Sequence, residues 1–256
     1  IRGGTGMRLE GKRTLITGAA SGFGKGIAEL YAAEGAQVAV LDMNGPGAKA
    51  VADGIGNRAI PLTCDVTQGG QVGRAVEDAV AAFGGIDVVV NNAGWTHRNK
   101  PMLEVSEEEF DRVYNVNVKS IFHMAHAVVP LFRRQGTGGV ILNVGSTAGI
   151  RPRPGLTWYN GSKGAANLLS KSMAVELAPD RIRVCGLAPV MGETAMLEDF
   201  MGLPDTPENR AKFVSTIPLG RMSQPLDIAR AALFLASDEA DFLTGVVMEV
   251  DGGRCV

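Results

Sequence analysis

The chain has 256 residues, 45% of them hydrophobic and 34 of them glycine, and its formal net charge is −2. This length and apolar content suffice for one sizeable core, and the glycine content suits many strand-to-helix turns. A near-neutral charge gives no basic field for nucleic acid, and no apolar run has the length of a membrane span. We therefore expect a soluble, cytoplasmic protein that binds neither nucleic acid nor membrane.

The first six residues, IRGGTG, precede a natural-looking start at Met7. We expect residues 1–6 to be a cloning remnant and residues 7–256 to form a single domain. The three cysteines are far apart and include no C-x-x-C pair. Neither a disulfide framework nor a metal site is predicted.

Strand-like and helix-like segments alternate along the chain. This order predicts an α/β fold, a Rossmann-like doubly wound sheet of seven mostly parallel strands with helices on both faces. The expected strands are 13–17, 37–42, 59–64, 86–91, 139–145, 182–188 and 246–250, and the expected helices are 23–34, 46–54, 69–83, 106–135, 157–178 and 225–236. A long connection with two short amphipathic pieces, ETAMLEDFM and PENRAKFVSTI, predicts a helical substrate lid at about 190–220.

The first motif in chain order is a glycine-rich turn, Gly18, Gly22 and Gly24, between the first expected strand and helix. Glycines allow a tight turn and let backbone N–H groups approach a pyrophosphate at the N-terminus of the following helix. The spacing is G-x-x-x-G-x-G rather than the commoner G-x-G-x-x-G. By itself the turn is also compatible with a plain tight connection.

Asp42 ends the next expected strand, AQVAVLDMN. An acid at this place accepts hydrogen bonds from the adenosine ribose of NAD and repels the extra phosphate of NADP. The neighbouring Ser21 and Met43 supply no cation for that phosphate. The sequence therefore predicts NAD as cofactor, with a solvated Asp that caps the next helix as the alternative.

Tyr159 and Lys163 lie four residues apart in WYNGSK, downstream of Ser146. On a helix this spacing places the phenol and the ammonium on one face. A nearby cation favours phenolate, so Lys163 is expected to bring the pKa of Tyr159 towards neutrality and make it a general base. Alone, the Y-x-x-x-K pattern is weak.

Together these motifs resemble the short-chain dehydrogenase/reductase family along essentially the whole chain. The matching pieces are TGAASGFG (17–24), Asp42, Asp65-Val66, NNAG (91–94), Asn117, Ser146, Tyr159 with Lys163, and VDGG (250–253). The resemblance implies a one-domain oxidoreductase that transfers a hydride between a secondary alcohol or ketone and NAD.

The resemblance also implies a set of site residues. The catalytic residues would be Asn117, Ser146, Tyr159 and Lys163, with Asn117 holding a water and Ser146 donating to the substrate oxygen. The cofactor-binding residues would be Gly18, Ser21, Gly22, Phe23, Gly24, Asp42, Met43, Asp65, Val66, Asn91, Ala93, Gly94, Tyr159, Lys163, Pro189, Gly192 and Thr194. No metal is implied.

The sequence says less about the substrate. Trp95, Trp158, Met191 and Met196 fall on segments expected to border it, which favours a cyclic or bulky molecule. Arg151 and Arg153, between Ser146 and Tyr159, either meet an anionic substrate or are solvated surface charge. Tetramers are common in the family, so a homotetramer is expected.

Two alternatives stay open. One is a 3-oxoacyl-(acyl-carrier-protein or CoA) reductase, which Asp42 disfavours because such reductases typically use NADPH. The other is a non-catalytic dinucleotide-binding regulatory protein, which would lack a member of the catalytic set, and none is missing. Val190 and Cys185 depart from the family pattern of Gly and Asn, and Val190 predicts a changed local path because it adopts positive φ less readily than Gly.

Overall fold

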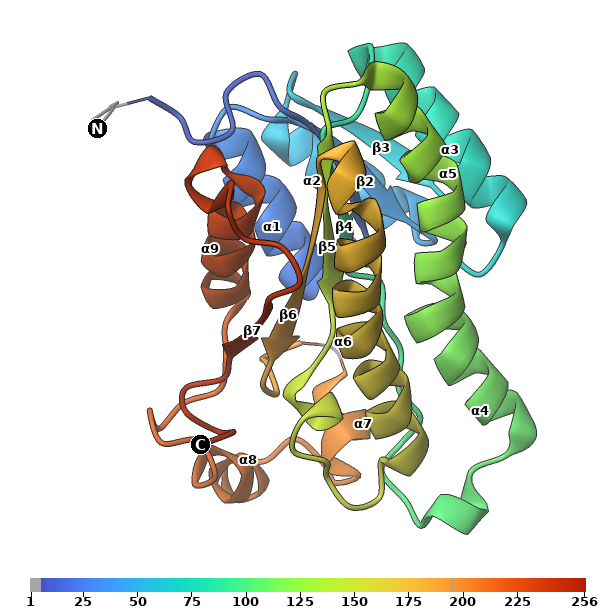
Figure 1. Ribbon diagram of the computed structural model, residues 1–256. Helices are drawn as coiled ribbons and strands as arrows, with labels where there is room; N and C mark the ends of the chain where they lie inside the picture. Colours follow the sequence, from blue (N-terminus) through green and yellow to red (C-terminus); the bar gives the residue numbers. More distant parts are fainter. Residues whose placement is uncertain (1–5, 195) are drawn as a thin grey trace.

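The computed structural model describes residues 6–194 and 196–256 (Figure 1). Within these residues seven strands form one sheet in the order β3-β2-β1-β4-β5-β6-β7, and all six pairings are parallel. The strands are β1 (Arg13–Thr17), β2 (Gln37–Asp42), β3 (Ala59–Thr63), β4 (Val88–Asn91), β5 (Gly139–Val144), β6 (Ile182–Pro189) and β7 (Val247–Val250). The predicted α/β, Rossmann-like sheet is confirmed.

Helices cover both faces of the sheet (Figure 1). The described α-helices are α1 (Gly22–Ala33), α2 (Gly45–Ile55), α3 (Gly69–Phe83), α4 (Glu107–Tyr114), α5 (Ser120–Gln135), α6 (Thr157–Leu177), α7 (Leu197–Met201), α8 (Pro207–Val214) and α9 (Pro225–Ala236). Helices α1, α2 and α9 pack on one face, and α3, α5 and α6 pack on the other. Each predicted strand and helix is present, with shifted ends and with one helix divided.

The alternation of side chains along each strand divides the core into two halves. Leu15 and Ile16, neighbours in β1, belong to the clusters on opposite faces, and both are fully buried. Since a parallel strand is covered on both faces, it tends to consist of near-continuous apolar residues, as VAVL in β2 does.

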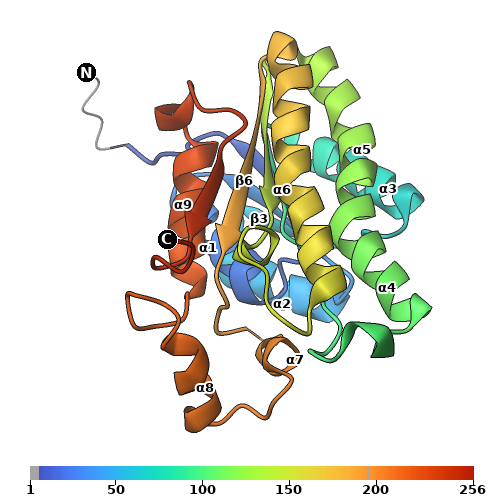
Figure 2. The ribbon, with the colours of Figure 1, turned by 60° about the horizontal axis from the view of Figure 1, so that its bottom comes forward.

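The strand order reverses between β1 and β4. Beginning at β1, the chain first adds β2 and β3 on one side and then continues with β4, β5, β6 and β7 on the other. In open α/β sheets, ligands bind outside the carboxyl ends of the strands at such a switch point. Figure 2 shows α7 beneath these strand ends, with α8 farther out.

The predicted helix 106–135 is interrupted. A π-helical segment, Asn115–Lys119, separates α4 from α5. The side chain of Asn117, within this segment, accepts a hydrogen bond from the Trp95 N–H and donates one to the Trp95 carbonyl. Directly after the segment, the Ser120 hydroxyl donates to the Val116 carbonyl at 2.5 Å. The Ser120 bond to a carbonyl four residues earlier competes with the regular helical pattern, and a sequence period of 3.6 does not reveal it.

Two residues near β6 depart from the family pattern, Val190 and Cys185, and neither has a strained backbone. Among the described non-glycine residues, positive φ occurs at Arg181, so Val190 is free of that strain. The Val190 N–H donates to the Val250 carbonyl at 3.3 Å, and Cys185 is buried in the core. The predicted difference in local path from the family pattern stays a prediction.

A search of the described helices finds none that is both long enough and apolar enough to cross a bilayer.

Replacing Gly24 by Ala is expected to destabilise the fold. A Cβ at this position would lie 2.3 Å from the Gly18 carbonyl oxygen and 2.4 Å from the Asn92 amide nitrogen. Relieving such overlap costs about 1–3 kcal/mol, or several degrees in the midpoint of thermal unfolding followed by circular dichroism. The matched control is Gly54→Ala in α2, where a Cβ meets nothing within 4 Å. That substitution should leave stability unchanged or raise it, and equal midpoints for the two variants would contradict the crowding at Gly24.

Candidate active site

A cavity of about 280 Å³ opens at the carboxyl ends of the strands. Its wall is built from the segments that follow β1 to β6, the N-terminus of α1, and residues of α4, α6 and α7. The predicted residues on this wall are Gly18, Ser21, Gly22, Phe23, Asp42, Met43, Asp65, Val66, Ala93, Gly94, Ser146, Tyr159, Lys163, Pro189, Gly192 and Thr194. Residues separated by up to 176 positions in sequence are thus brought to one site, because the strands of one parallel sheet all end at the same edge.

Three predicted residues lie off the wall: Gly24, Asn91 and Asn117. The side chain of Asn91 is buried and donates to Asn143 at 2.9 Å, so it ties β4 to β5. The structure does not bring its side chain to the cofactor-binding wall as expected.

Asn92, which the sequence reasoning missed, is on the wall instead. Its amide donates to the carbonyls of Thr17 at 2.9 Å and Gly18 at 3.1 Å, which joins the end of β4 to the end of β1. Asn92 is the second Asn of the NNAG motif. The alternation of side chains along a strand, which turns Asn91 and Asn92 to different sides, was the signal that could have separated them.

The glycine-rich turn fits the phosphates of a dinucleotide. Gly18 and Gly22 have φ of 63° and 54°, and α1 begins at Gly22 with no acidic residue in its first turn. A Cβ on Gly18 would lie 2.8 Å from the Ala93 Cα. Free N–H groups at a helix N-terminus attract anions, so Gly18, Ser21 and Gly22 would hold the pyrophosphate.

Asp42 is fixed at the end of β2. One carboxylate oxygen accepts from the Ala20 N–H at 3.0 Å and the other from the Asn44 N–H at 2.9 Å. The alternative reading of Asp42 as the cap of the next helix is wrong, because Asn44 caps α2 by accepting from the Gly47 N–H at 3.1 Å. The carboxylate is thus held by two N–H groups on a wall that suits the adenosine ribose.

The side chains of Ser146, Tyr159 and Lys163 converge in the same cavity. Ser146 lies two residues after the end of β5, and its hydroxyl accepts from the Ala148 N–H at 3.0 Å. Tyr159 and Lys163 lie in the first two turns of α6, and only 4% and 5% of their surfaces are exposed. The Lys163 ammonium donates to the Val144 carbonyl at 2.9 Å, with Nζ 5.9 Å from the Tyr159 ring centroid.

Burial dominates the acid–base properties of this group. It raises the pKa of Tyr159 above its ordinary value, opposed by a hydrogen bond with Ser146. It also lowers the pKa of Lys163 to about 8. The expectation that Lys163 brings the pKa of Tyr159 towards neutrality is wrong for the protein chain alone, because desolvation outweighs any effect of an ammonium that is directed at the Val144 carbonyl.

Asn117 is buried and its side chain is engaged. Its amide oxygen accepts from the Trp95 N–H at 2.9 Å, and its amide nitrogen donates to the Trp95 carbonyl at 2.9 Å and the Ser162 hydroxyl at 3.0 Å. This links the π-helical segment to the loop after β4 and to α6. Asn117 therefore positions the wall residue Trp95, and its role with a water stays a prediction.

Large apolar side chains line the part of the cavity beside Tyr159. Trp95, Met191 and Met196 line it as expected, but Trp158 does not: its indole N–H donates to the Met102 carbonyl at 3.2 Å. Phe200 of α7 was not predicted, and its ring packs edge-on against Tyr159 with 5.1 Å between centroids. The segment predicted as a lid thus contacts Tyr159 directly.

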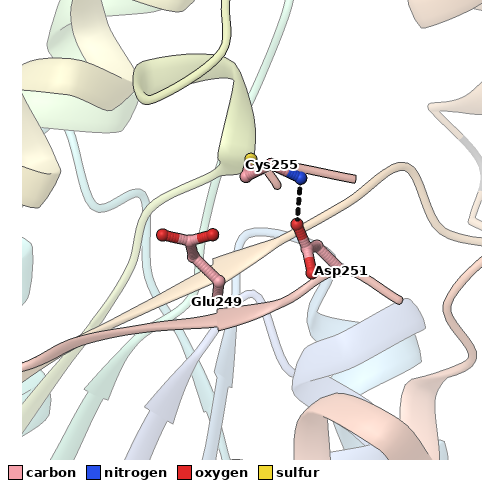
Figure 3. A group of neighbouring side chains, drawn as sticks. All are labelled: Glu249, Asp251 and Cys255. Carbon is pink, nitrogen blue, oxygen red and sulfur yellow. Dashed lines mark hydrogen bonds between the residues drawn. The ribbon is translucent and has the colours of Figure 1, made fainter. Parts of the chain in front are cut away.

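A group outside the cavity, Glu249, Asp251 and Cys255, brings possible ligand atoms within 4.8 Å of one another (Figure 3). The Asp251 carboxylate accepts from the Gly253 N–H at 2.9 Å and the Cys255 N–H at 2.8 Å. Burial and Asp251 raise the pKa of the Cys255 thiol to about 11, which keeps it protonated. These contacts give Asp251 the role of closing the C-terminal turn.

Comparison with known proteins identifies the class. A family model described as enoyl-(acyl carrier protein) reductase matches residues 18–254. The chain is 51% identical to 4-formylbenzenesulfonate dehydrogenase of Comamonas testosteroni, covering 97% of this chain and 99% of the relative. It is 42% identical to a 3-oxoacyl-[acyl-carrier-protein] reductase of Thermotoga maritima, covering 98% and 100%, and 39% identical to 7alpha-hydroxysteroid dehydrogenase of Escherichia coli, covering 96% and 95%.

Solved structures agree. The crystal structure of 3-ketoacyl-(acyl-carrier-protein) reductase from Brucella melitensis complexed with NADH superposes with a TM-score of 0.92 at 45% identity, covering 97% of this chain and 100% of that one. The chain belongs to the short-chain dehydrogenase/reductase family. It is an oxidoreductase that acts on CH–OH groups and binds a nicotinamide dinucleotide.

The buried Lys163 should give the fold a distinctive pH dependence. Its pKa falls from 10.5 when unfolded to about 8 when folded, so the cost of burying the charge is fully present below pH 8 and disappears as pH rises through 10.5. Relative to Lys163→Met, wild-type protein should gain about 3 kcal/mol in free energy of unfolding between pH 7 and pH 10.5. Urea unfolding of both proteins without nucleotide measures this difference, in which the other titrations cancel. A difference that stays constant with pH would contradict the lowered pKa.

Proposed function

We propose that this protein is an NAD-dependent oxidoreductase that interconverts a secondary alcohol and a ketone, with Tyr159 as general acid and base. The observation that carries the proposal is the convergence of Ser146, Tyr159 and Lys163 in the cavity that also contains the glycine-rich turn. In hydride transfer the cofactor carries the hydride, and the protein has to bind the dinucleotide and supply acid–base groups beside it.

When bound, the nicotinamide supplies the hydride acceptor or donor, and its oxidised form adds a positive charge. Asp42 and the Gly18–Gly22 turn would hold the adenosine and pyrophosphate portions, and Thr194 and Lys163 the remainder. Selection of NAD over NADP follows from the fixed Asp42 carboxylate, since a second negative charge about 4 Å away costs on the order of 4 kcal/mol.

The chain's own residues handle the proton. Ser146 donates a hydrogen bond to the substrate oxygen, where negative charge develops. The Tyr159 hydroxyl takes the proton from an alcohol or returns it to a ketone. Lys163, charged below its pKa of about 8, lowers the cost of the phenolate in a site that otherwise disfavours it.

The apolar wall formed by Trp95, Leu156, Met191 and Phe200 favours a substrate with a ring or another bulky apolar part. The names of the relatives support this: they act on 4-formylbenzenesulfonate and on a 7alpha-hydroxysteroid, and another at 39% identity is a cyclopentanol dehydrogenase. The segment 190–220 would act as the lid, because α7 packs on Tyr159 through Phe200.

A second candidate is reduction of a 3-oxoacyl thioester on acyl carrier protein or CoA. Two relatives carry such names, at 42% and 45% identity. The structure of one of them contains NADH, so the argument from Asp42 against this candidate is weaker than the sequence suggested. Parallel assays of 3-oxoacyl thioesters and ring-bearing ketones with NADH and NADPH separate the two candidates.

We also propose a cytoplasmic homotetramer. The exposed apolar side chains of Phe122 on α5 and of Leu168 and Val175 on α6, 55%, 63% and 81% exposed, support an interface formed by these helices. Light scattering coupled to size-exclusion chromatography measures the mass directly, and a monomer would contradict the proposal.

Tyr159→Phe should lower kcat at least about 100-fold, because the proton donor and acceptor is removed while the ring and its packing against Phe200 remain. NADH binding, followed by fluorescence, should change little. Tyr114→Phe is the matched control: it removes a hydroxyl from a side chain outside the cavity wall and should keep nearly full activity. A Tyr159→Phe enzyme with more than a few per cent of wild-type turnover would exclude Tyr159 as the base.

Asp42→Ser should change the cofactor preference. We expect wild-type kcat/KM to favour NAD over NADP by at least about 100-fold. The variant should have a smaller ratio, because its kcat/KM with NADP is higher. Asp53→Ser, which removes an exposed carboxylate from α2, should leave the ratio unchanged. Preference of the wild-type enzyme for NADP would overturn the role of Asp42.

A further inference from the structure

Arg153 is a charged residue that has no role in the proposed hydride transfer. It lies in the loop between β5 and α6, six residues before Tyr159, and lines the same cavity. Its Nη2 atom is buried and has no hydrogen-bond partner among the described residues. A buried guanidinium nitrogen without a partner is costly and indicates a group that binds there.

The surroundings of Arg153 do not neutralise its charge. None of the ion pairs between described residues includes it. Burial lowers its pKa, and so do two further cations, Arg254 and Arg151. The guanidinium carbon lies 5.5 Å from the ring centroid of Phe213 in α8, which places it under the lid.

The position of Arg153 shows which ligand it can meet. The acidic wall residues, Asp42 and Asp65, follow β2 and β3, whereas Arg153 follows β5. Strands β1 and β4 lie between them. The turn that fits the pyrophosphate follows β1, so Arg153 lies on the side of Tyr159 and the apolar wall. A second wall cation, Arg112, is already stacked on the Trp95 ring at 4.3 Å.

We propose that Arg153 binds an anionic group of the substrate, a carboxylate or a sulfonate, and so selects alcohols and carbonyl compounds that carry one. This inference rests on the proposed function, because the anion belongs to the molecule that Tyr159 deprotonates or protonates. The planar guanidinium donates two parallel hydrogen bonds to such a group. Pro152 and Pro154 restrict the backbone on either side of Arg153, which reduces the entropy lost on binding.

Matched substrates test the selection. We compare 1-phenylethanol with 4-(1-hydroxyethyl)benzoate and 4-(1-hydroxyethyl)benzenesulfonate, each with NAD. Wild-type kcat/KM should be higher for the anionic compounds, and Arg153→Gln should lower it for them by at least about 10-fold, with less than about 3-fold change for the neutral alcohol. Arg153→Lys keeps the charge and should keep part of the preference. Equal losses for neutral and anionic substrates would overturn the proposal.

Arg151→Gln is the control for net charge, since Arg151 is an exposed arginine in the same loop and is off the cavity wall. It should change the preference by less than about 3-fold. If Arg151→Gln loses as much of the preference for anionic substrates as Arg153→Gln does, the preference comes from the overall positive charge of the loop. That result would overturn a specific site at Arg153.

Direct binding separates this proposal from the proposed function. Benzoate and benzenesulfonate are titrated calorimetrically into wild-type protein and Arg153→Gln with NAD present. If no alcohol is turned over, the proposed function fails, yet anion binding that is lost in Arg153→Gln still supports the site. Equal binding of these anions by wild-type protein and Arg153→Gln overturns the proposed anion site. A different mass of the Arg153→Gln assembly in solution also overturns it, because the guanidinium would then belong to a contact between copies of the chain.

Discussion

The junction between β1 and β4 is the constraint on which the rest of the site depends. The Asn92 amide joins the Thr17 and Gly18 carbonyls, and the space beside Gly18 and Gly24 admits no Cβ. This contact holds the turn at the start of α1 against the loop after β4. The glycine-rich turn and the wall that continues to Gly94 therefore share one fixed reference. Ser146, which lies after β5, and Tyr159 and Lys163 of α6 are placed relative to it through the sheet.

Much of the architecture could be predicted from the sequence, because parallel strands and their helices leave strong apolar patterns. The strand 13–17 and the helices 69–83 and 225–236 have the predicted bounds. The break at Asn115–Lys119 could not be predicted from the apolar pattern, and neither could the bond between Asn117 and the Trp95 backbone, 22 residues away.

The candidate site, like the fold, could be predicted only in part from the sequence. Motifs located the glycine turn, Asp42 and the Ser146-Tyr159-Lys163 group, because each has a characteristic residue spacing or a place at the end of an apolar run. Motifs did not show that Asn91 binds Asn143, nor that Phe200 reaches Tyr159, because such contacts arise between distant segments. The direction of the Tyr159 pKa shift was missed because desolvation depends on burial, which residue spacing does not report.

The edge-on contact between Phe200 and Tyr159 has a consequence for acidity. Phe200 belongs to α7, a helix of five residues. The Phe200 ring shields the phenol of Tyr159 from water. Any outward displacement of α7 hydrates the hydroxyl and eases its ionisation, whereas its return makes the charged form less favourable again. A displacement of α7 would therefore change the proton affinity of Tyr159 even though no residue of this helix exchanges a proton with it.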